Sequence, residues 1–234
     1  MTHRTVRGKI QYIYEARGSD EEFGWEWFSI THHEDGQHTV RAQCEIKAGF
    51  VAERSVTRDV VYSLDRQYRP LDCFVRLHES GHFLGAGWFR FDGQCAHGVA
   101  KSVKTGVTTQ IIPLDNPIPS VGAHPLLCDM LHCMAYDHNK QARVQRSRGV
   151  MMTSLELDGC SGPFLTPHNM DIEYLGEENV SVPAGSFDAE HYRFPGVEFP
   201  EEEVWLVREP LQFVRVRVGG SMKSRYDLIK ISNE

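Results

Sequence analysis

The stretch that decides the fold reads VSVPAGSFDAEHYRF over residues 180–194 and continues to residue 231. Pro183 fixes its φ angle and Gly185 can take a positive φ, so together they predict a tight turn. After the turn, side chains of residues 187–194 alternate between two faces, as those of a strand must. The stretch therefore predicts a turn that leads into paired strands.

Three further strands complete this stretch. Residues 204–207 read Val-Trp-Leu-Val, a compact apolar strand, and residues 213–218 place valines on one face and Phe or Arg on the other. Gly219-Gly220 predicts a hairpin, after which residues 224–231 return as the last strand. The chain from residue 180 onward is therefore expected to form an antiparallel meander.

The same residues resemble an uncharacterised bacterial family. Its pattern is V-P-A-G-[S/T]-F-[D/E], a strand, a Val-Trp strand and a last strand with Tyr-Asp-Leu, here residues 226–228. The resemblance covers the last quarter of the chain. It implies a large curved antiparallel sheet, comparable with lipoprotein-carrier folds, in a family made up mostly of envelope proteins.

The N-terminus departs from that family. Residues 1–7, MTHRTVR, contain no apolar segment of the kind found in a secretory signal. No apolar run reaches the roughly 18 residues that span a bilayer. The sequence therefore predicts a cytoplasmic protein without a membrane partner.

The rest of the chain continues the β pattern. Three hairpin-linked strands are expected in the first third, and two more pairs over residues 71–91 and 95–112. Residues 113–125 hold four prolines and predict a stiff loop between two β halves. After it, apolar residues at 127, 130, 131 and 134 have helical spacing. We expect residues 1–234 to form one all-β domain, an antiparallel barrel or strongly curved sheet with one helix packed across it.

Composition narrows the class of function. The 234 residues are 41% hydrophobic, which supports a substantial core, and the formal net charge of −7 argues against a nucleic-acid partner. The six cysteines show no CxxC pair, so free and mostly buried thiols are expected. Neither a P-loop nor a dinucleotide glycine fingerprint is present.

The segment 72–97 concentrates chemically active side chains. If its strands turn them inward, His78 is the expected general base, Arg76 and Arg90 would hold an oxyanion or carboxylate, and Trp88 would stack on the substrate. The alternative is a polar row on the outer surface of a half-buried sheet. A one-residue change in register exchanges the two faces, so both interpretations stay open.

The terminal meander offers a second set of cavity residues. His191, Tyr192, Arg215 and Tyr226 are candidates for substrate binding. A ladder of charges between neighbouring strands explains the same residues equally well.

A metal site has weak candidates in His124, Asp129 and His132, residue types that suit zinc or iron. The spacing H-x4-D-x2-H does not put all three on one helical stripe unless His124 bends back from the loop. The named zinc motifs are missing, so the expectation is a protein without a cofactor.

Two functions follow from these residues. The first is a cofactor-independent lyase or isomerase that abstracts a proton from a small aromatic or apolar molecule held in a β-barrel cavity. The alternative is a non-catalytic binding or carrier protein for a small hydrophobic molecule. A purely structural role would instead predict an exposed apolar patch. Homo-oligomer formation is left open.

Overall fold

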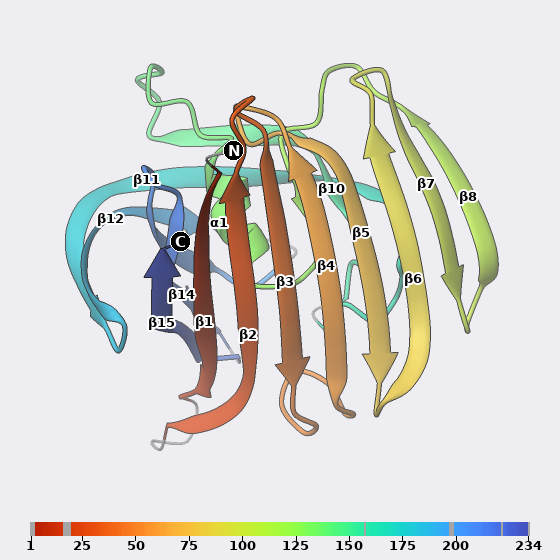
Figure 1. Cartoon of the computed structure of the whole chain (residues 1–234), viewed down its shortest axis with the longest axis horizontal. Helices are drawn as coiled ribbons and strands as arrows, with labels where there is room; N and C mark the ends of the chain where they lie inside the picture. The colour runs from red at the N-terminus through yellow and green to blue at the C-terminus, as the bar shows by residue number, and fades with distance from the viewer. Residues whose placement is uncertain (1–2, 16–19, 157, 197–198, 221, 234) are drawn as a thin grey trace.

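The computed structural model describes residues 3–15, 20–156, 158–196, 199–220 and 222–233. In this part of the chain, fifteen strands form one sheet, and one short helix lies against it (Figure 1). The elements are β1 (Arg4–Tyr14), β2 (Glu21–His32), β3 (His38–Ile46), β4 (Val56–Leu64), β5 (Pro70–Glu79), β6 (His82–Phe91), β7 (Cys95–Ser102), β8 (Gly106–Pro113), β9 (Val121–Gly122), α1 (Leu127–Cys133), β10 (Val144–Met152), β11 (Thr166–Val182), β12 (Gly185–Phe194), β13 (Glu202–Val207), β14 (Gln212–Val218) and β15 (Ser224–Asn233).

The sheet is curved and does not close. Its order is β8-β7-β6-β5-β4-β3-β2-β1-β15-β14-β13-β12-β11-β10-β9, so the first and last strands pair in the middle and β8 and β9 are the edges. Neighbouring strands are antiparallel except β9 and β10, which run parallel. The prediction of an all-β domain with one helix is therefore confirmed, and in the described residues it takes the form of a strongly curved, unclosed sheet.

Alternating burial explains why these segments are strands. In β4, Val56, Arg58, Val60, Tyr62 and Leu64 are all buried, and the residues that alternate with them are partly exposed. Burying an aliphatic side chain of this size contributes about 1.5–3 kcal/mol to stability, and every second residue of the strand points to the inner face. The inner faces of the curved sheet thus form one hydrophobic core.

β11 is longer than the sequence predicts. Only its last residues, 180–182, belong to the stretch from which the meander is predicted, and the whole strand has 17 residues. Its register with β12 shifts between Tyr174 and Gly176, where Gly176 takes a φ of +123° and the strand can bend. Figure 1 shows β11 and β12 curving behind the strands of the N-terminal half.

The proline-rich segment does not separate two sheets. It contains β9, which pairs with β10, and the hydrogen-bonded order of strands runs through both predicted halves. Pro125 then precedes α1, as the sequence predicts.

Glu26 on β2 fixes the start of α1 to the inner face of the sheet. Its carboxylate accepts hydrogen bonds from the backbone N–H of Leu126 at 2.8 Å and of Leu127 at 3.3 Å. Tyr12 on β1 donates its hydroxyl to the same carboxylate at 2.7 Å. The helix, seen behind β1 and β2 in Figure 1, is therefore held by a buried acid. In the described part of the chain, no helix combines the length and hydropathy that crossing a membrane requires.

Candidate functional site

A cavity of about 240 Å³ lies between α1, the inner face of the sheet and the segment that links β12 to β13. It is larger than the roughly 150 Å³ that accommodates a benzene molecule in an apolar protein interior. Its lining comprises Tyr12, Phe23, Ile46, Val51, His124, Leu126, Cys128, Asp129, His132, Arg146, Met152, His168, Asn169, Met170, Asp171, Phe194, Pro195, Gly196, Phe199, Pro200, Glu202, Val218, Met222 and Tyr226.

One wall of the cavity is aromatic. The ring of Tyr12 meets that of Tyr226 edge-on at 4.8 Å between centroids and that of Phe23 at 5.7 Å. Phe50 stacks on Phe23 from outside the lining at 5.4 Å. These contacts are of the kind that adds to area burial, so the wall is rigid and apolar.

The cavity lining contains three carboxyl groups, of which Asp129 on α1 and Glu202 on β13 lack a salt bridge in the described chain. Among the described residues, neither has a salt-bridge partner, and Asp129 has one hydrogen-bond contact, from the thiol of Cys128 at 3.7 Å. Burial and repulsion by Glu202 raise the pKa of Asp129 well above its usual range, and burial raises the pKa of Glu202 to about 7. These two carboxyl groups therefore lack a compensating cation among the described residues, whereas Asp171, the third, pairs with Arg146 at 3.4 Å.

Two histidines of the cavity are held by neighbouring polar atoms. His132 Nδ1 lies 2.6 Å from the hydroxyl of Ser120, and His124 Nε2 donates to the carbonyl of Ser154 at 2.9 Å. Burial lowers the pKa of His132 to about 4 and that of His124 to about 3. Both imidazoles are neutral at pH 7, so each has one nitrogen lone pair.

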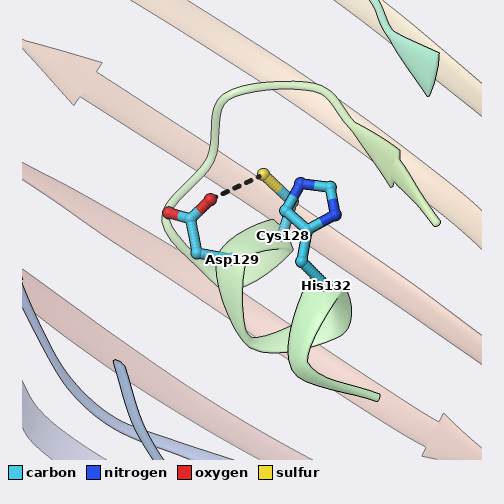
Figure 2. Close-up of side chains that lie close together, drawn as sticks. All are labelled: Cys128, Asp129 and His132. Atoms are coloured by element: carbon cyan, nitrogen blue, oxygen red, sulfur yellow. Dashed lines mark hydrogen bonds between the residues drawn. The ribbon is translucent and has the colours of Figure 1, made fainter. Parts of the chain in front are cut away.

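Cys128, Asp129 and His132 come together on α1. A ligand atom of each residue, the thiol sulfur, a carboxylate oxygen and an imidazole nitrogen, lies within 4.8 Å of the other two. Figure 2 shows the three side chains close together on the helix, with the imidazole beside the thiol. Thiol, carboxylate and imidazole are the ligands that zinc sites in proteins use.

The terminal meander contributes one of its predicted residues to the cavity. Tyr226 is in the lining, whereas His191 stacks on Trp205 at 4.1 Å and approaches Glu178 at 3.0 Å. Arg215 pairs with Asp227 at 2.6 Å. His191 and Arg215 therefore interact with side chains of neighbouring strands.

Tyr192 also lies outside the cavity lining, in a hydrogen-bonded cluster. Its hydroxyl donates to Glu190 at 2.5 Å and accepts from Arg208 at 2.6 Å, and His138 approaches it at 2.9 Å. This network joins β12 to the segments that follow α1 and β13.

The residues proposed for catalysis lie elsewhere. Arg76, Trp88 and Arg90 point to the exposed outer face of β5 and β6, where Trp88 is 47% exposed. His78 is half-buried beside Phe83, with ring centroids 6.1 Å apart. The inward orientation assumed for Arg76 and Arg90 is therefore wrong, because the buried side chains of these strands are their neighbours in sequence. The catalytic roles of Arg76, His78 and Arg90 stay predictions, because these residues lie away from the cavity.

Three important residues were missed by sequence reasoning. Cys128 stands four residues before His132, a spacing that puts both on one helical face, and this signal was available. Glu26 and Glu202 carry no comparable signal, because alternation alone does not distinguish a buried acid from one that faces solvent. His124 lines the cavity but is not one of the three clustered residues.

Comparison with known proteins addresses the fold. No family model matches the chain, and no curated protein matches its sequence. A crystal structure from Brucella abortus, described as a β-barrel-like protein of the domain of unknown function DUF1849, is similar with a TM-score of 0.60. The shared feature is the fold. Sequence identity is 8%, and the match covers 97% of each chain. The similarity is consistent with the expected likeness to an uncharacterised family of β-sheet proteins.

Proposed function

We propose that the protein binds a small, largely apolar molecule in the cavity beneath α1, as a binding or carrier protein. The observation that carries this proposal is an interior cavity of about 240 Å³ whose aromatic wall faces two carboxyl groups without salt-bridge partners in the described chain. Concave, mainly apolar sites with a few polar groups are the usual sites of small-molecule binding.

The volume and the walls define the apolar part of the ligand. A molecule slightly larger than a single aromatic ring fits a cavity of this size. Phe23, Met170 and Tyr226 offer ring faces and a thioether on different elements, and methionine adapts its shape to varied apolar partners.

The carboxyl groups define the polar part. Asp129 and Glu202 can accept hydrogen bonds from a hydroxyl or amine, and an ammonium group would also stabilise the ionised form of either carboxyl. A ligand that carries a carboxylate offers no such compensation and would be repelled by the ionised form. We therefore expect a ring-sized molecule with an amine or hydroxyl and without an acidic group.

Lyase or isomerase activity stays an untested prediction. The cations assigned to it, Arg76 and Arg90, lie on the outer face. Arg146, the arginine in the cavity lining, is more than half exposed and lies 3.4 Å from Asp171, which compensates its charge. Binding without turnover is accordingly the function that the described geometry favours.

Calorimetric titration of metal-stripped protein with three one-ring compounds tests the proposal. Benzylamine and phenol are expected to bind, and benzoate at least about tenfold more weakly, a difference of about 1.4 kcal/mol. Met170→Trp, which fills the cavity, should abolish binding. Val144→Trp on β10, where the wild-type side chain is 48% exposed, is the matched control and should leave it unchanged. Equal affinity for benzoate and benzylamine, or unchanged binding by Met170→Trp, would overturn the assignment.

A further inference from the structure

We infer that Cys128, Asp129 and His132 form a binding site for a divalent transition metal, of which Zn²⁺ suits the ligands best. The inference goes beyond the proposed function and does not depend on it, because these three side chains stand together whether or not an organic molecule enters the cavity. It also departs from the cofactor-free expectation and replaces His124 by Cys128 among the candidate ligands.

The spacing of the ligand atoms fits a metal after a small adjustment. Zn–S bonds of about 2.3 Å and Zn–N or Zn–O bonds of about 2.0–2.1 Å put tetrahedral ligands about 3.5 Å apart. The three ligand atoms already lie within 4.8 Å of one another, and the thiol of Cys128 is 3.7 Å from a carboxylate oxygen of Asp129. A bound metal would draw the ligand atoms together by up to about 1.3 Å, the difference between 4.8 Å and the tetrahedral separation.

The orientation of His132 is fixed in the way that metal-binding histidines require. The hydroxyl of Ser120 forms a hydrogen bond with Nδ1 at 2.6 Å, so Nε2 is the nitrogen that remains for a metal. Gly122 keeps the space beside Nε2 open, because a Cβ at that position would lie 3.1 Å from this atom. A hydrogen bond to the second ring nitrogen selects the tautomer and holds the ring in place.

The charge of the surroundings also favours a cation. Asp129 and Glu202 face the cavity, and neither has a salt-bridge partner in the part of the chain that the structure describes. A divalent ion bound by the thiol of Cys128 and the carboxyl of Asp129 would replace their protons and supply the charge partner that Asp129 lacks among the described residues.

The donor set selects the kind of metal. One sulfur, one nitrogen and one oxygen ligand favour zinc and its borderline neighbours over Mg²⁺ or Ca²⁺, which prefer oxygen alone. Three protein ligands leave a fourth tetrahedral position, and all three residues belong to the cavity lining. An exogenous ligand, water or an organic donor, would occupy that position.

Titration of the full chain with the metal alone tests the inference. Zn²⁺ should bind one to one, and Co²⁺ should give a thiolate-to-cobalt absorption band together with the visible spectrum of a tetrahedral site. Cys128→Ser should remove the thiolate band and weaken Zn²⁺ binding at least about 100-fold. Cys133→Ser is the matched control, because its buried thiol lies on the same helix and contacts the backbone carbonyl of Asp129 at 3.4 Å. That variant should keep both signals.

A second measurement needs no variant and remains decisive if Cys128→Ser fails to fold. Alkylation of the wild-type protein, followed by peptide mass spectrometry, should show that Zn²⁺ protects Cys128 more than the other cysteines. Absence of one-to-one binding by the wild-type protein, a thiolate band that survives in Cys128→Ser, or protection of another cysteine instead would overturn the inference.

Discussion

Glu26→Gln should remove a large part of the pH dependence of folding stability. Burial raises the pKa of this carboxyl from 4.5 to about 7, against the lowering effects of the hydrogen bonds from Tyr12 and from the start of α1 and of the nearby charge of Arg58. Glutamine has the same shape. Its amide oxygen can take the place of the carboxylate oxygen that accepts from both Tyr12 and Leu126, and its amide nitrogen then replaces the oxygen that the N–H of Leu127 approaches at 3.3 Å, the longest of the three contacts.

The magnitude follows from the pKa difference. Below pH 4.5 the carboxyl is protonated in both the folded and the unfolded chain, so Glu26 adds no pH dependence there. Between pH 4.5 and 7 the unfolded chain releases the proton more readily, and the free energy of unfolding falls as the pH rises. A shift from 4.5 to about 7 corresponds to about 3 kcal/mol in total, and most of it lies between pH 5 and 8.

Urea unfolding at pH 5, 6, 7 and 8 measures this effect. The difference in unfolding free energy between Glu26→Gln and the wild type should move by about 2–3 kcal/mol in favour of the variant from pH 5 to pH 8. Glu21→Gln, which removes an exposed carboxyl from the same strand, is the control and should follow the wild type. Parallel pH profiles for Glu26→Gln and the wild type would refute the reasoning, since the comparison cancels the contributions of Glu202 and the histidines, and the charge of Glu26 itself raises the pKa of Asp129.

Three further changes have defined outcomes. Gly159→Ala should cost about 2–4 kcal/mol in urea unfolding, because its Cβ would lie 2.1 Å from Nη2 of the buried Arg58 at a φ of +69°; an unchanged midpoint would contradict this. Ser120→Ala should weaken Zn²⁺ binding about 10–100-fold and keep the cobalt–thiolate band, because the ligands of the metal remain; equal affinity would show that Ser120 does not orient His132. Trp88→Ala should leave benzylamine affinity within about twofold of the wild type by calorimetry, because this side chain lies on the outer face, and a larger loss would favour an outer-face site.

Local signals predict much of the fold. Alternation in residues 213–218 and the Gly219-Gly220 pair place β14, the following turn and β15 correctly. The helix after Pro125 follows from apolar spacing. Closure of the sheet could not be predicted, because β8 and β9, although only residues 114–120 separate them in the chain, are the two edge strands, and whether they meet depends on the curvature of all the strands between them.

The candidate site was harder to predict than the fold. Alternation shows that Arg76 and Leu77 point to opposite faces, but which face is interior depends on how the whole sheet curves. The cavity needs β1, β11, β13 and α1 together, and Glu202 reaches it from a glutamate-rich segment that looks exposed in the sequence. The Cys128–His132 spacing was the one local signal for the cluster on α1.

A crystal structure of the metal-stripped protein with benzylamine would show whether the cavity beneath α1 is the ligand-binding site. The ring should lie in this cavity, among Phe23, Met170 and Tyr226, with the amine within hydrogen-bonding distance of Asp129 or Glu202. A ring bound on the outer face against Trp88, with the cavity free of ligand, would contradict this prediction.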